Sequence, residues 1–334
     1  MTPNDLKAVL LATAFVVAAP PAFGELSEVP EAIHATLEAH VYDPGMLESS
    51  AYREIRHRTE RLARDSRDPG QFVDGFNRLW QDGPFSHVRI QQADQDAESL
   101  ARSLDALRVG GAGARLEWRD DIAILTVDTM MGLDTIEQID LAYEQIAAKR
   151  PRALVIDLRN NDGGAFAVKP LVGHLLVEPL DAGAFMSRRW AAAQPGLPTR
   201  GQVLAVAPWE GWSIASFWDD VQESALTRVR FAPIAPHYGG PVYVLVSRRT
   251  ASAAELAADA LKALGRTTLV GERTAGEMLS QKPYDLPGGL ALFLPIADYF
   301  SLRKGRIEGH GLEPDVEVPA GEALDEALRQ ARGR

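Results

Sequence analysis

The stretch from Gly240 to Gln281 most constrains the fold, because it joins a buried strand to a helix through a short polar turn. Residues 241–246 form an apolar run typical of a core strand, and apolar residues recur every four positions from Leu256 onward. Ser252 lies between these two segments. A serine at this place is suited to nucleophilic catalysis, since the unpaired N–H groups of a first helical turn can hold a developing oxyanion.

The same stretch has a second interpretation, in which Thr250 or Ser252 only caps the helix. Glu255 follows Ser252 by three residues, which is the spacing of a capping box. The local pattern by itself leaves both interpretations open.

The first 24 residues have the pattern of an export signal. A weakly basic start at Lys7 precedes an apolar run over residues 8–19 that is too short to span a bilayer. Small residues then suit a cleavage site ending at Gly24. We expect residues 1–24 to be removed, leaving residues 25–334 as a periplasmic or secreted protein without a stable membrane span.

Composition excludes several classes of function. The chain has no cysteine, so disulfides, thiolate metal sites and cysteine nucleophiles are excluded. Its formal net charge of −11 argues against a general nucleic-acid binder. The chemistry suggested by the serine needs no metal and no organic cofactor, and the sequence leaves the oligomeric state open.

The glycine-rich segment 110–113 divides the chain into two patterns. Residues 25–109 are predicted to be mostly helical, with helices over 28–40, 46–63, 71–81 and 93–107 and an extended piece over 86–90. Residues 110–334 alternate strands with helices, and residues 153–158 are apolar enough for a strand covered on both faces. We therefore predict an α/β core with a mixed, mainly parallel sheet flanked by helices, preceded by an N-terminal helical subdomain.

Residues 178–239 show no clear periodicity and are predicted to form an irregular insertion in the core. They contain several prolines and glycines and four tryptophans, Trp190, Trp209, Trp212 and Trp218. Aromatic residues in such a segment either line a binding cleft or form a satellite core.

Three other places carry residues with chemical potential. Ser86-His87 follows a turn, and a histidine there is either a general base or a structural residue. Gly163-Gly164 follows the apolar strand 153–158 and either aims an N–H group at a substrate oxygen or forms an ordinary turn. Glu308 lies in a glycine-bearing segment and is either catalytic or a solvated turn carboxylate.

Four blocks of the sequence together resemble the C-terminal processing (tail-specific) serine peptidases: LVIDLRNNDGG, VYVLVSRRTASAAELAADAL, VGERTAG and EGHGLEPDVEVP. They occur in the order found in that family, and the resemblance covers about residues 110–320. It implies a ClpP/crotonase-like fold, serine peptidase activity and a peptide or protein substrate. A PDZ domain, which many members carry, has no room between His87 and Gly110.

The resemblance also sorts the chain between the two catalytic styles of the family. Ser/Lys members carry their lysine where this chain has Glu277. The tricorn protease core instead uses a histidine within a Ser-His pair, supported by a glutamate near the C-terminal Gly-x-x-Pro-Asp block. Ser86-His87 and Glu308 match that pattern. The resemblance therefore implies Ser252 as the nucleophile and His87 as its base, with Ser86 and Glu308 orienting His87.

The same resemblance implies an oxyanion hole made by the N–H of Ala253 with that of Gly163 or Gly164. Two alternatives remain open. One is a Ser/Lys peptidase that uses Lys282, which lies five residues after Glu277. The other is a non-catalytic protein that binds a lipid, a retinoid-type ligand or a peptide, because the fold also resembles that of photoreceptor retinoid-binding proteins.

Overall fold

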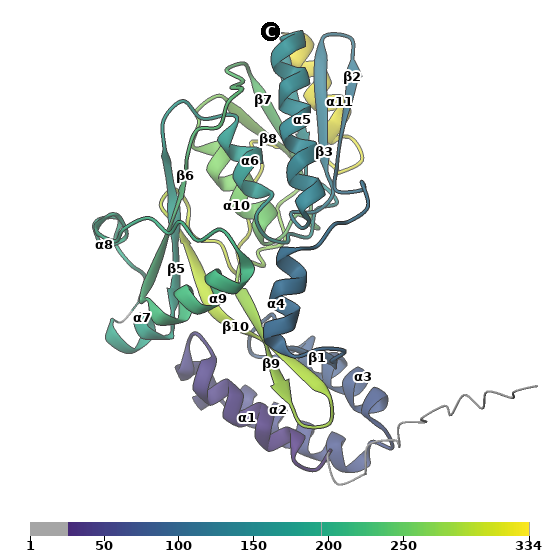
Figure 1. Cartoon of the computed structure of the whole chain (residues 1–334), viewed down its shortest axis with the longest axis vertical. Helices are drawn as coiled ribbons and strands as arrows, with labels where there is room; N and C mark the ends of the chain where they lie inside the picture. The colour runs from purple at the N-terminus through teal and green to yellow at the C-terminus, as the bar shows by residue number, and fades with distance from the viewer. Residues whose placement is uncertain (1–25, 195, 334) are drawn as a thin grey trace, which may run out of the picture.

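The computed structural model describes residues 26–194 and 196–333 (Figure 1). The predicted export signal, residues 1–24, lies outside the described residues. None of the helices in the described ranges is both long enough and apolar enough to cross a membrane.

The core contains the predicted mixed, mainly parallel sheet. Its strands follow the spatial order β12 (Val316–Glu317), β8 (Thr267–Gly271), β7 (Val242–Val246), β4 (Ala153–Asp157), β3 (Ile122–Val127) and β2 (Ala114–Arg119). All neighbouring strands are parallel except β2, which forms an antiparallel hairpin with β3. The mainly parallel core is as predicted.

Helices cover both faces of this sheet. One face packs against α5 (Leu133–Lys149), α6 (Val168–Gly173) and α10 (Ala253–Lys262), and the other against α11 (Ala323–Arg332). Successive side chains of a strand point to opposite faces, so both faces of β4 and β7 are apolar. Every residue of these two strands is buried, which explains the continuous apolar runs in the sequence.

A second sheet is antiparallel, and the sequence pattern does not distinguish its strands from those of the first sheet. Its central strand is β10 (Leu290–Ser301), which pairs with β1 (Arg89–Gln92), β5 (Leu180–Ser187), β9 (Ser280–Leu286) and β11 (Gly305–Arg306); β6 (Leu226–Phe231) pairs with β5. Because β1 comes from the N-terminal region, this sheet crosses the predicted boundary at Gly110. The N-terminal region is therefore joined to the core by strand pairing and not by a linker alone.

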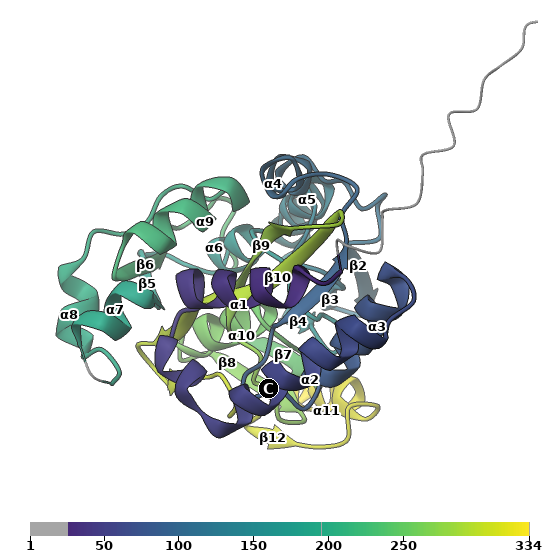
Figure 2. The same cartoon turned by 90° about the horizontal axis from the view of Figure 1, so that it is seen from below.

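The N-terminal region contains α1 (Val29–His40), the 3-10 helix η1 (Pro44–Glu48), α2 (Ser50–Asp65), α3 (Pro69–Trp80) and α4 (Ala97–Asp105). The predicted single helix over 46–63 is wrong, because the Ser49 side chain accepts from Tyr52 N and starts a new helix there. Figure 2 shows α1 lying across β9 and β10, the two strands that it contacts.

The prediction of an irregular insertion over 178–239 is also wrong. Strands β5 and β6 frame this segment, with α7 (Arg188–Ala193), α8 (Arg200–Ala205) and α9 (Ile214–Glu223) between them. Strand β5 has little local signature, since half of its residues are small, and it is stabilised by its pairing with the distant strand β10. Tertiary pairing, which a local pattern does not contain, decides the structure here.

Candidate active site

Ser252 occupies a strained turn between β7 and α10. Its backbone has φ 53° and ψ −122°, a combination that non-glycine residues rarely adopt. Thr250 is fully buried and is held by Ser247 N and by the backbone oxygen of Leu158, so it fixes the turn from inside. Strain of this kind is stored at functional sites when the surrounding structure enforces it.

Glu255 has a larger role than the predicted capping partner. Its carboxylate accepts from the backbone N–H of Ser252 (3.2 Å), Gly276 (2.9 Å) and Glu277 (2.9 Å) and from the hydroxyl of Thr274. The side chain is fully buried, and burial raises its pKa while these four donors oppose that rise. Glu255 thus ties Ser252 to the loop that carries Glu277, a role that the S-x-x-E spacing does not indicate.

His87 belongs to a hydrogen-bonded chain of three side chains. Ser86 Oγ lies 2.7 Å from His87 Nδ1 and donates to Glu308 Oε1 at 2.6 Å. An ionised carboxylate only accepts, so the serine oxygen is left to accept from an Nδ1–H of His87. That tautomer leaves the lone pair of His87 on Nε2, where a general base needs it.

Glu308 is buried and not a solvated turn carboxylate. It is only 9% exposed, and its second oxygen accepts from the backbone N–H of Met278 at 2.6 Å. Burial lowers the pKa of His87, and the carboxylates of Glu308 and Glu277 partly oppose this by favouring the charged imidazolium. His87 itself has a left-handed φ of 64°, so both members of the candidate catalytic pair have unusual backbone conformations.

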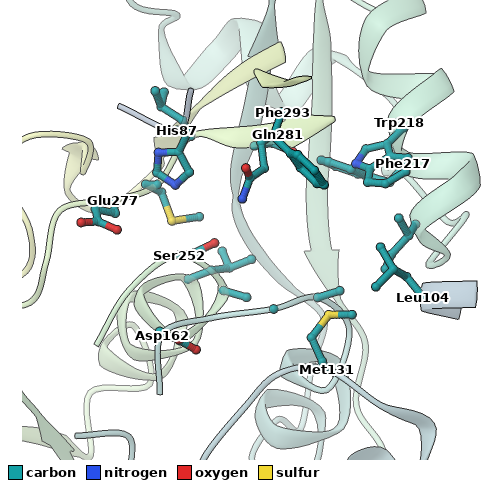
Figure 3. Close-up of a pocket in the computed structure, with 18 of the residues that line it drawn as sticks. His87, Leu104, Met131, Asp162, Phe217, Trp218, Ser252, Glu277, Gln281 and Phe293 are labelled. Atoms are coloured by element: carbon teal, nitrogen blue, oxygen red, sulfur yellow. The ribbon is translucent and has the colours of Figure 1, made fainter. Parts of the chain in front are cut away.

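Ser252 and His87 line one pocket of about 930 Å³ (Figure 3). The pocket lies where the carboxyl ends of β4 and β7 meet the second sheet, and Ser86, Ala253 and Gly164 also line it. Among the described residues no hydrogen bond joins His87 to Ser252. Such catalytic hydrogen bonds often form only when substrate is bound.

The two candidate glycines differ in what their N–H groups do. Gly163 N donates to Asn161 Oδ1 at 2.9 Å, and Asn161 is itself fully buried. Within the described part of the chain, the N–H groups of Gly164 and Ala253 have no protein acceptor, and both residues face the pocket. Geometry therefore favours Gly164 over Gly163 as the partner of Ala253.

Gly163 is required for a steric reason instead. A Cβ at this position would lie 2.6 Å from Ser252 Cβ and 3.0 Å from the backbone oxygen of Ala251. Its φ of 105° also disfavours any other residue. Gly163 therefore allows the loop at the end of β4 to approach Ser252 closely.

Lys282 points away from the pocket. Its Nζ donates to Asp219 Oδ1 and Gln222 Oε1, both at 3.1 Å, and Lys282 is not among the residues that line the pocket. Glu277, at the position of the family lysine, does line the pocket, and its backbone oxygen accepts from Ser252 N at 2.9 Å.

Several pocket residues had no individual role in the sequence prediction. Gln281 lies beside Ser252 and His87 with its side chain pointing into the pocket (Figure 3), and its buried Oε1 has no hydrogen-bond donor among the described residues. Of the four tryptophans in segment 178–239, Trp209, Trp212 and Trp218 line the pocket, whereas Trp190 belongs to a separate core cluster.

Known sequences match the core of the chain. A carboxyl-terminal-processing protease of Picosynechococcus sp. is 37% identical over 117 residues, which are 33% of this chain and 28% of that protein. A chloroplastic C-terminal processing peptidase of Tetradesmus obliquus is 29% identical over 177 residues, which are 53% and 31% of the two chains. The matches thus span about a third of the length of these curated relatives.

Solved structures share the fold over most of the chain. A putative peptidase from Parabacteroides merdae superposes with a TM-score of 0.59 at 16% identity, covering 91% of this chain and 96% of that one. The tricorn protease gives a TM-score of 0.56 at 13% identity, covering 93% of this chain and 37% of that one. These likenesses establish the fold.

The family itself is established by a sequence model. The model described as Peptidase family S41 matches residues 121–318, which are more than half of the chain. The matched range contains Ser252, Glu308 and both candidate glycines. Together with the shared fold, this match shows that the chain belongs to peptidase family S41.

Proposed function

We propose that this protein is an exported serine peptidase that cleaves peptide bonds through an acyl-enzyme. The observation that carries the proposal is the chain His87–Ser86–Glu308, which opens into the same pocket as Ser252. Ser86 and Glu308 hold the Nδ1–H tautomer of His87 and stabilise its charged form, as the buried carboxylate of a catalytic triad does.

In the acylation step, His87 Nε2 removes the hydroxyl proton of Ser252 as Ser252 Oγ bonds to the substrate carbonyl carbon. The N–H groups of Ala253 and Gly164 stabilise the resulting oxyanion. His87 then gives the proton to the amide nitrogen as the C–N bond breaks, releasing the amine product.

Deacylation repeats these steps with water as the nucleophile. His87 takes a proton from water as its oxygen bonds to the acyl carbon, and returns that proton to Ser252 Oγ as the ester bond breaks. The side chains that this scheme uses are all contributed by the chain itself.

The test uses intact mass after incubation with a fluorophosphonate, which labels only an activated serine. Wild type and Lys282→Ala are expected to gain one label, because the Lys282 ammonium is bonded to Asp219 and Gln222. Ser252→Ala and His87→Ala are expected to gain none. Labelling that survives in Ser252→Ala, or that is lost only in Lys282→Ala, would refute this assignment of roles.

The apolar lining of the pocket favours one second candidate, a protein that binds an apolar ligand without catalysis. Absence of labelling in folded wild type, together with lipid recovered by solvent extraction, would favour this candidate over the peptidase.

We further propose that the mature protein is periplasmic. The support is the predicted signal over residues 1–24. N-terminal sequencing of the protein from the periplasmic fraction is expected to begin at Glu25, and a protein that retains Met1 in the cytoplasm would contradict export.

A further inference from the structure

The pocket around Ser252 has two unlike sides. Figure 3 shows Leu104, Phe217 and Trp218 on one side of Ser252 and Glu277 and Asp162 on the other. All five line the same pocket, and they come from segments far apart in the sequence.

The apolar side is a preformed wall. The ring of Phe217 packs edge-on against Phe185 at a centroid distance of 4.9 Å and against Trp209 at 5.3 Å. Trp218 is buried behind this wall, and Leu104 extends it from α4. Aromatic side chains fixed in this way give a bound apolar side chain contact area without having to reorganise.

The other side is acidic. The carboxylates of Glu277 and Asp162 are exposed and have no hydrogen bond or ion pair to any described residue. Glu277 is held beside the nucleophile by its backbone, which donates to Glu255 and accepts from Ser252. Arg89, the one Lys or Arg among the described residues of the pocket lining, lies with its guanidinium over Phe293 at 3.8 Å.

Gln281 presents a hydrogen-bond acceptor inside the pocket. Its Oε1 is buried and accepts from no donor among the described residues, which is unfavourable for a polar atom. The N–H group of a peptide bound along the pocket would satisfy it. This observation favours an extended peptide over a compact apolar ligand.

We propose that the pocket selects a peptide with a large apolar side chain on one side of the scissile bond and a cationic group on the other. The cationic group is a lysine or arginine side chain or a free N-terminal ammonium, and an acidic residue there is repelled by Glu277 and Asp162. The inference rests on the proposed peptidase function.

The first experiment digests a randomised peptide mixture with the full-length protein and maps the cut sites by mass spectrometry. The expected result is enrichment of Phe, Trp, Leu or Met on one side of the cut, with Lys, Arg or the peptide N-terminus within two residues on the other. The proposal is supported whether the apolar residue lies on the N-terminal or the C-terminal side of the cut. Cleavage with neither preference, or with acidic residues enriched, would overturn it.

Variants then assign each preference to its side chain. Phe217→Ala is expected to reduce the ratio of kcat/KM for a Phe peptide over its Ala analogue about 10-fold. Glu277→Gln is expected to reduce the ratio for a Lys peptide over its uncharged Gln analogue about 3-fold. Leu141→Ala and Glu144→Gln, at exposed positions on α5, are the matched controls and should leave both ratios unchanged.

The labelling experiment distinguishes failure of the proposed peptidase function from failure of the proposed selectivity. Folded wild type that takes no fluorophosphonate label refutes the peptidase function on which the inference rests. Wild type that is labelled and cleaves peptides, but whose ratios do not change in Phe217→Ala and Glu277→Gln, refutes only the selectivity proposed for this pocket.

Discussion

Ser86 Oγ lies 2.6 Å from Glu308 Oε1, although 222 residues separate the two positions in the sequence. The bond joins the N-terminal region to a loop of the core, beside the place where β1 pairs with β10. The candidate base is therefore oriented only when both parts of the chain are folded together.

Glu308→Gln is expected to lower kcat by about 100-fold or more, with little change in folding. The amide keeps the shape of the carboxylate but does not hold the charged imidazolium, and the corresponding carboxylate-to-amide change in a catalytic triad lowers kcat by about 10⁴-fold. Steady-state peptide hydrolysis measures kcat, and circular dichroism measures whether the variant is folded. Glu313→Gln, an exposed change in the same segment, is the control. Equal kcat values in the two variants would contradict the role of Glu308.

The acid limb of the rate profile should lie below pH 6.5, the usual pKa of histidine. His87 must be neutral to act as a base, and burial lowers its pKa, so the protein stays active at pH values where an exposed histidine is protonated. Profiles of kcat/KM against pH, recorded with an uncharged peptide, measure the limb.

Two variants should move this limb in opposite directions. Glu277→Gln removes a carboxylate that favours the charged form, so it should shift the limb to lower pH; Arg89→Gln removes a cation that disfavours that form, so it should shift the limb upward. Glu144→Gln should not move it. Shifts of the opposite sign would show that His87 is not the titrating group.

Gly163→Ala is expected to abolish fluorophosphonate labelling. The added methyl group would overlap Ser252 Cβ at 2.6 Å, and the positive φ adds strain of about 1–3 kcal/mol. The control is Gly289→Ala, which also has a positive φ but has no atom within 4 Å of the new Cβ. Labelling of Gly163→Ala at the wild-type rate would show that the close approach is not needed.

Glu255→Gln should destabilise the protein by about 3 kcal/mol. Each carboxylate oxygen accepts from two donors. Replacing either oxygen by an NH2 group therefore leaves two buried donors without an acceptor, opposite an NH2 group that is itself a donor. Urea denaturation measures the loss in free energy of unfolding. Glu272→Gln, in the partly exposed start of the same loop, should change stability by much less. A Glu255→Gln protein as stable as wild type would mean that the carboxylate does not organise this loop.

The sequence by itself determined the local features around Ser252. The apolar run, the polar turn and the four-residue periodicity predicted β7, the turn after it and the start of α10 to within about a residue. Alternating strands and helices predicted the parallel sheet, because burial on both faces leaves a continuous apolar run in each strand. The motif blocks indicated the family, which the match over residues 121–318 confirmed.

The tertiary structure decided what depends on distant pairing. The sheet around β10 joins segments from distant parts of the chain, and its strand β5 has no strong local pattern, so the sequence predicts an irregular segment over 178–239. The same holds for the site. Asn161 accepts from the N–H of Gly163, whereas that of Gly164 has no acceptor among the described residues. Glu308 becomes buried against Ser86 and Met278. Periodicity reports burial along one segment, whereas these roles depend on hydrogen-bond partners that only the folded chain brings together.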